Sequence, residues 1–133
     1  MKVTIESWDK KSNKLVLKVR QAALKLGRLL GMEDSYAEIY LVGKSFMDKN
    51  VLSFPAPKKF PRPDIGKKYK YLGEIYLNPD YIAKEHLEIT EDKLRYMLIH
   101  GFLHLLGYDH KKKDDIIRME KKEARLLEQL HKQ

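Results

Sequence analysis

Three of the five histidines of this chain fall within one stretch of eleven residues, and their spacing suits a metal site. His100 and His104 are four positions apart in a segment of helical periodicity, so their imidazoles project from one helix face, one turn apart. Gly107 permits the positive φ that ends a helix sharply, after which the chain can turn back and bring in His110. Three histidine ligands leave a fourth position for water, which is typical of a hydrolytic zinc site. We therefore predict one zinc ion per chain, bound by His100, His104 and His110.

An ordinary structural role remains the alternative for any single histidine, because most lone histidines are partly buried and hydrogen-bonded. Three polar rings in an otherwise apolar helical segment are costly to bury, and this cost favours a metal. His86 and His131 have no such surroundings, and the ordinary interpretation applies to both.

The same spacing, H-x-x-x-H-x-x-G-x-x-H, occurs in the metzincin proteases. Those enzymes carry a glutamate directly after the first histidine as the general base. Here that position is Gly101, which has no group for acid–base chemistry. Peptide hydrolysis is therefore disfavoured. Phosphodiester cleavage fits better, because a metal ion and positioned cations can stabilise the charge that develops on phosphate oxygens.

Length and composition narrow the class of protein. A chain of 133 residues supports one domain over 1–133, and 43% hydrophobic residues supply a core. The absence of cysteine excludes disulfides, a cysteine nucleophile and thiolate metal sites.

The net charge of +8 favours a polyanionic partner, either nucleic acid or an acidic membrane surface, although it also simply aids solubility. No apolar run approaches the roughly 20 residues of a membrane span. The start of the chain lacks the apolar stretch of a signal peptide. We expect a soluble, cytoplasmic protein that does not bind membranes.

Apolar periodicity predicts an α+β domain, with a small mixed sheet of about four strands, helices packed against it and the zinc site at the end of a central helix. Ser12 or Asn13 is the expected cap of the first helix, and Thr90 that of the second. Residues 56–71 lack apolar periodicity and are expected to form a long loop. The expected strands cover 2–8, 36–43, 50–54 and 72–78, and the expected helices cover 14–30, 91–106 and 112–130.

The stretch HGFLHLLGYDH at 100–110 resembles the signature of the YbeY family of bacterial endoribonucleases. The resemblance extends over about residues 36–130, through NVLSFP at 50–55, LGEIYLN at 72–78, and Met119 and Glu120. It implies a metal-dependent endoribonuclease acting on single-stranded RNA, with a role in 3′-end maturation of small-subunit ribosomal RNA and in ribosome quality control. It also implies that the three histidines are the zinc ligands.

The chain departs from the family just before NVLSFP. Family members carry a helix there with an arginine thought to be functional, whereas the segment LVGKSFMDKN contains no arginine. Lys44 and Lys49 are the nearest cations and the candidates for the catalytic role of that arginine. Lysine lacks the guanidinium fork that grips phosphate through two bonds. The leading hypothesis is thus a nuclease, and the alternative is a non-catalytic, zinc-containing RNA- or ribosome-binding protein.

A basic segment over 44–70 carries net +6 of the total charge, with Phe60, Tyr69 and Tyr71 interleaved. Cations for the backbone and rings for unpaired bases are typical of single-stranded RNA binding, although a solvated loop has the same composition. Asp109 is either a partner of a ligand imidazole or a turn residue, and Ser53 is either a substrate contact or an ordinary strand residue. The candidate RNA-binding residues are Lys58, Lys59, Arg62, Lys67, Lys68 and Lys70.

Overall fold

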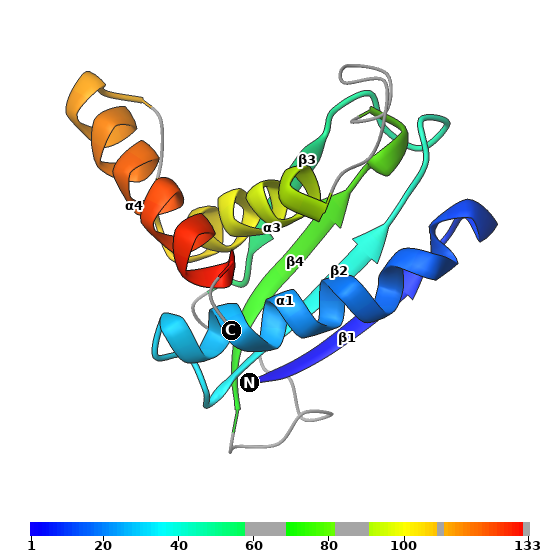
Figure 1. Cartoon of the computed structure of the whole chain (residues 1–133), viewed down its shortest axis with the longest axis horizontal. Helices are drawn as coiled ribbons and strands as arrows, with labels where there is room; N and C mark the ends of the chain where they lie inside the picture. The colour runs from blue at the N-terminus through cyan, green and yellow to red at the C-terminus, as the bar shows by residue number, and fades with distance from the viewer. Residues whose placement is uncertain (58–68, 82–90, 109–110, 132–133) are drawn as a thin grey trace.

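In the computed structural model, the fold is built on one mixed sheet (Figure 1). Its strands are β1 (Lys2–Ser7), β2 (Ser35–Leu41), β3 (Val51–Pro55) and β4 (Lys70–Leu77). The order across the sheet is β1-β2-β4-β3, with β1, β2 and β4 mutually parallel and β3 antiparallel to β4. The structure describes residues 1–57, 69–81, 91–108 and 111–131. The predicted α+β class and four-stranded mixed sheet are confirmed.

Residues 79–81 are helical, and three further α-helices and one short 3₁₀ helix lie within the described residues, close to the predicted positions. They are η1 (Lys10–Leu15), α1 (Val16–Leu29), α3 (Glu91–Leu105) and α4 (Lys113–His131). Within the described ranges, none of these helices combines the length and the apolar character that crossing a membrane requires.

The predicted start of the first helix is wrong. Asp9, not Ser12 or Asn13, is the capping residue, and its side chain accepts a hydrogen bond from the Lys11 amide of η1 at 3.0 Å. Ser12 is buried within this turn. The backbone at Leu15 already has right-handed helical angles, so η1 continues directly into α1 and no side chain caps α1. Thr90, the expected cap of α3, lies outside the described residues.

The core lies between one face of the sheet and the helices α1 and α3. Ile5, Ile39 and Ile75 are aligned across three strands and project toward this face because strand side chains alternate. α1 contacts β1, whereas α3 contacts β3 and β4. α4 packs on α3 and on α1 (Figure 1). The central helix is therefore held between the sheet and α4.

The connection from β2 to β3 contains turns and no helix, in agreement with the short sequence there. Asn78, fully buried at the end of β4, holds this connection in place. Its side-chain amide donates to the Met47 carbonyl at 2.9 Å, and its backbone amide donates to the Asn50 carbonyl at 2.9 Å. These two hydrogen bonds thus fix residues 42–50 against the end of β4.

Candidate metal centre

His100 and His104 lie on one face of α3, as their spacing predicts. Their ring centroids are 4.6 Å apart at an interplanar angle of 74°. The two Nε2 atoms face each other at 3.1 Å. Two imidazoles thus direct the same ring nitrogen to a common point.

The other ring nitrogen of each histidine is held by an acceptor. Nδ1 of His104 lies 2.9 Å from the carbonyl oxygen of Tyr108, and Nδ1 of His100 lies 2.7 Å from Oε2 of Glu123. A carbonyl and a carboxylate only accept hydrogen bonds, so these partners place the proton of each neutral ring on Nδ1. With both rings neutral, each Nε2 presents a lone pair toward the other, and a shared proton or a bound metal ion relieves this repulsion. Histidines that bind metals have this arrangement, with the second nitrogen donating to a carboxylate or a carbonyl.

Glu123 is a residue of the candidate site that the sequence did not single out. It is 2% exposed, in α4, and its carboxylate reaches across to α3. A buried carboxylate is costly unless it is paired, and His100 provides that pair. The signal was present in the sequence, because Glu123 falls at helical spacing among the buried residues Met119, Leu126 and Leu130 of α4. Glu120, one of the positions of family resemblance, is exposed.

Tyr96 lies one turn before His100 on α3, and their rings are stacked with centroids 6.4 Å apart. Burial, together with the charge and hydrogen bond of Glu123, raises the pKa of the Tyr96 hydroxyl above its ordinary value. This hydroxyl therefore remains protonated beside the carboxylate that holds His100.

Gly101 faces the sheet, and its lack of a side chain has a packing reason. A Cβ placed there would lie 2.9 Å from Cγ2 of Ile75 and 3.3 Å from Oγ of Ser53. The Ser53 hydroxyl donates a hydrogen bond to the Gly101 carbonyl at 2.9 Å, which ties β3 to α3. The glycine thus lets α3 approach the sheet, and Ser53 has a structural partner.

The histidine pair lines a hollow of about 390 Å³ at the end of α3. Gly107 has φ of +101°, as predicted for the turn that ends this helix. Within the described ranges, no Lys or Arg lines the hollow, and no third His, Asp or Glu completes a set of metal ligands with the pair. His110 and Asp109 lie outside these ranges. The other lining residues are Val51, Leu52, Ser53, Pro55, Gly107 and Tyr108.

The structure does not bring Lys44 to the histidine pair. Lys44 lines a different hollow with Trp8 and Phe46, and its backbone amide donates to Asp80 at 3.2 Å. Lys49 is exposed, two residues before β3 begins.

Only part of the predicted basic loop belongs to the described residues. Lys70 is exposed at the start of β4, so it is a strand residue and not a loop residue. Tyr71 also belongs to β4, where its hydroxyl donates to Glu38. The remaining candidates lie outside the described ranges: Lys58, Lys59, Arg62, Lys67 and Lys68.

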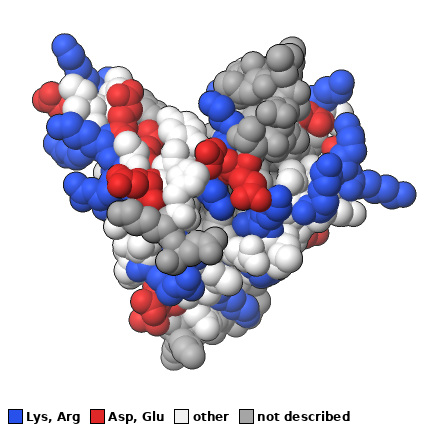
Figure 2. Space-filling model, in the orientation of Figure 1, with Lys and Arg blue, Asp and Glu red and all other residues white. Residues whose placement is uncertain are grey.

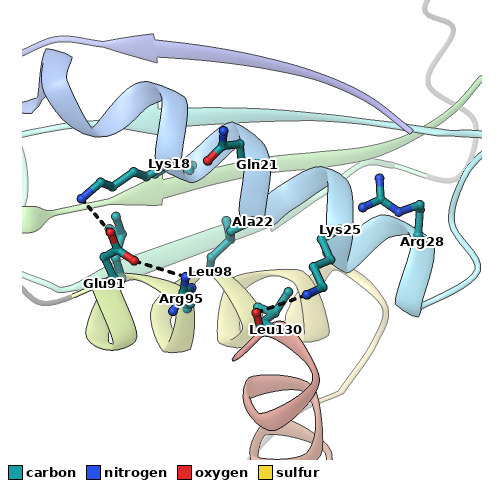
Figure 3. A pocket seen from close by; sticks show the side chains of 11 residues that line it. Lys18, Gln21, Ala22, Lys25, Arg28, Glu91, Arg95, Leu98 and Leu130 are labelled. Carbon is teal, nitrogen blue, oxygen red and sulfur yellow. Dashed lines mark hydrogen bonds and ion pairs between the residues drawn. The ribbon is translucent and has the colours of Figure 1, made fainter. Parts of the chain in front are cut away.

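A larger hollow, of about 490 Å³, lies between α1, α3 and the end of α4 (Figure 3). Glu91 joins Lys18 at 2.7 Å and Arg95 at 3.2 Å, so an ion-pair network links α1 to α3. The hydrogen bond and charge of Lys18, with the charge of Arg95, lower the pKa of Glu91. Lys25 donates to the Leu130 carbonyl at 3.3 Å and links α1 to α4. These cations join helices, and the hollow does not include the histidine pair.

The charges of α4 are mixed, as expected for a solvated helix face. Figure 2 shows Lys and Arg side chains beside Asp and Glu over this helix. His131, at the end of α4, is exposed and lies 3.0 Å from Asp92 of α3, consistent with an ordinary surface histidine. His86 lies outside the described residues.

Comparison with known proteins shows a consistent set of relatives. Residues 40–131 match the family model described as Endoribonuclease YbeY. An Endoribonuclease YbeY from Rhizobium leguminosarum is 43% identical over 88 residues, which cover 61% of this chain and 47% of that protein. An Endoribonuclease YbeY from Pelagibacter ubique is 44% identical over 89 residues, which cover 62% of this chain and 56% of that protein. The matched part thus spans about half the length of these curated relatives.

One solved structure has a similar fold. The solution structure of TM1509 from Thermotoga maritima matches 96% of this chain and 88% of its own, with a TM-score of 0.63 and 23% sequence identity. This likeness supports the fold of the described residues, including elements that precede the family match.

Proposed function

This chain belongs to the endoribonuclease YbeY family, and we propose that it is a zinc-dependent endoribonuclease acting on single-stranded RNA. The observation that carries the proposal is the pair of Nε2 atoms of His100 and His104, which face each other at 3.1 Å while both Nδ1 atoms are held by acceptors. Such a donor set, at the wall of a hollow, fits a bound cation.

His100, His104 and His110 would hold one zinc ion at the end of the central helix α3. When bound, zinc supplies Lewis-acid chemistry suited to phosphodiester hydrolysis. The residues of the chain set the geometry for it. Glu123 and the Tyr108 carbonyl fix the orientation and tautomer of two rings, and Gly107 turns the chain toward position 110.

The proposed substrate follows from charge and from family membership. The basic segment over 44–70 would contact the phosphates of an unpaired RNA strand. The family resemblance supports a role in 3′-end maturation of ribosomal RNA and in ribosome quality control, with the small ribosomal subunit as partner in the cytoplasm. We further propose that residues 1–133 form one such domain.

One observation supports the alternative, a zinc-containing protein that binds RNA or the ribosome without cleaving it. The described residues that line the histidine hollow include neither lysine nor arginine, so they provide no cation for a phosphate in the transition state. Of the two candidates, Lys44 lines another hollow.

Metal analysis together with an RNA cleavage assay separates the two functions. We expect close to one zinc per purified chain and cleavage of single-stranded RNA that stops on chelation and returns with zinc. His104→Ala should lose both, whereas His131→Ala, at an exposed histidine outside the site, should keep both. Bound zinc without cleavage would favour the binding protein. A chain that takes up no zinc would contradict both functions.

A further inference from the structure

The sheet has a second face, on which no helix packs among the described residues. α1 and α3 cover the inner face, which carries Ile39 and Ile75. Side chains alternate along each strand, so the neighbouring positions project from the opposite side. We call this side the outer sheet face. Its strand residues include Lys2, Thr4, Glu6, Tyr36, Glu38, Tyr40, Leu52, Phe54, Glu74 and Tyr76.

Five aromatic rings, from Trp8, Tyr40, Phe46, Phe54 and Tyr76, form a continuous cluster on the outer sheet face. Their centroids are 4.9 Å apart for Trp8 and Phe46, 5.0 Å for Tyr40 and Tyr76, and 5.6 Å for Phe54 and Tyr76. Trp8 is 50% exposed, Phe46 55% and Phe54 51%. A group of large apolar rings that remains half-exposed is typical of an interaction surface.

Carboxylates stand beside these rings. Glu38 and Glu74 are directly paired across β2 and β4, and Glu6 pairs with Tyr40 across β1 and β2. The hydroxyl of Tyr76 donates to Glu74 at 2.9 Å, and burial together with this carboxylate raises the pKa of Tyr76 to about 12. The hydroxyls of Tyr40 and Tyr71 likewise donate to Glu38, so tyrosines orient both carboxylates, and Glu74 is the one directly paired with Phe54.

The described strand side chains of the outer sheet face carry a net charge opposite to that of the chain. Among the described strand residues of this face, three glutamates stand beside one cation, Lys2, whose ammonium lies 5.7 Å from the centre of the Tyr36 ring, whereas the whole chain carries +8. Lys10, Lys11 and Lys44 line the hollow at the Trp8 and Phe46 end of the aromatic cluster, together with Asp9 and Asp80. The paired carboxylates of Glu38 and Glu74 repel phosphates, so the part of this face over β2 and β4 suits RNA poorly. A cationic partner is the complementary one.

We propose that the outer sheet face docks an arginine-bearing segment of a protein partner. A guanidinium stacks on exposed aromatic rings and donates two parallel hydrogen bonds to one carboxylate, and this face provides both groups next to each other. Phe54 and Glu74 are directly paired across β3 and β4, so one arginine can contact both. The proposal does not depend on the nuclease function, because the histidine pair lies on α3, on the other side of the sheet.

The only tryptophan of the chain, Trp8, lies in this cluster and reports directly on its occupation. The probe is a nonapeptide of arginine, titrated into the full chain while Trp8 emission is recorded. A nonapeptide of citrulline, which has the same shape without the charge, is the matched ligand control. We expect the arginine peptide to change the emission and to bind at least about tenfold more tightly than the citrulline peptide.

Variants test whether the carboxylates and rings of this face are responsible. The pair Glu38→Gln and Glu74→Gln should weaken arginine binding by about tenfold, and Glu33→Gln, at an exposed acid outside the strands, should leave it unchanged. Phe54→Leu removes a half-exposed ring while keeping Trp8 and both glutamates, and it should weaken binding even if the glutamine pair fails to fold.

Three results would overturn the proposal. The first is an unchanged Trp8 emission with the arginine peptide, and the second is equal binding to the parent chain and to the glutamine or leucine variants. The third is binding of a single-stranded oligouridylate that changes Trp8 emission and grows stronger in the glutamine pair, which would make this face a nucleic-acid surface.

Discussion

The carboxylate of Glu123 lies 2.7 Å from Nδ1 of His100, although the two residues are 23 positions apart and belong to different helices. Glu123 is 2% exposed, so this contact places a carboxyl group in the interior beside the proposed zinc ligands. A carboxylate in this position increases the basicity of the imidazole and keeps its Nε2 free to bind a metal. The relationship explains why an acid occurs in the buried stripe of α4.

Replacement of Glu123 by glutamine should weaken zinc binding while leaving the chain folded. The amide keeps the shape of the side chain but loses the charge, and loss of such a partner typically costs about 10–100-fold in metal affinity. Competition with a chromophoric chelator measures the affinity. Glu120→Gln, at an exposed acid of the same helix, is the matched control and should bind zinc as the parent does. Equal zinc affinities for the two variants would mean that Glu123 has a packing role only.

Gly101→Ala should lower the free energy of unfolding, by about 1–3 kcal/mol, because the new methyl group overpacks the interface of α3 with the sheet. Its Cβ would lie 2.9 Å from Cγ2 of Ile75, a buried residue of β4. Urea denaturation measures the loss.

Gly27→Ala in α1 is the control for this substitution. A Cβ at Gly27 meets only the Met1 side chain, which can move, so the loss should be smaller and offset by the better helix propensity of alanine. A Gly101→Ala chain as stable as Gly27→Ala would contradict the close approach of α3 to β4.

Changing Lys67, Lys68 and Lys70 together to glutamine should weaken RNA binding about equally for all single-stranded sequences. Each lost phosphate contact reduces the salt dependence, by about 0.7 in the slope of log affinity against log salt concentration. Titrations at several salt concentrations measure this slope. The triple change of Lys111, Lys112 and Lys113, exposed at the start of α4, is the control and should leave the slope nearly unchanged. An unaltered slope in the first variant would show that its charges serve solubility.

Lys49→Met should lower the rate of RNA cleavage by about 10²–10³-fold with zinc content unchanged, if a cation near β3 stabilises the phosphate charge. Lys44→Met is the matched control, because Lys44 lines the hollow beside Trp8 and not the histidine hollow. Lys49→Arg should keep or raise the rate, since a guanidinium can bind two phosphate oxygens. If both methionine variants cleave RNA as fast as the parent chain, neither lysine is the catalytic cation. The cation would then lie in the basic segment beyond residue 57, or cleavage would need no such cation.

The sequence alone determined what depends on neighbours along the chain. Apolar periodicity located the strands and helices to within a few residues, and it indicated the α+β class. The four-residue spacing of His100 and His104 determined their common face, because a helix repeats every 3.6 residues. Gly107 marked the turn after them, since few other residues adopt its positive φ of +101°.

The tertiary structure decided what depends on contacts between distant segments. It placed Glu123 on His100, packed Gly101 against Ile75, and put Lys44 in a hollow away from the histidine pair. It also joined Trp8, Phe46 and Tyr76 on the outer sheet face. None of these contacts follows from local periodicity, because each depends on how α3 and α4 pack and on the order in which the strands pair. A local pattern specifies the direction of a side chain within its own element, whereas its partner is set by the packing of the elements.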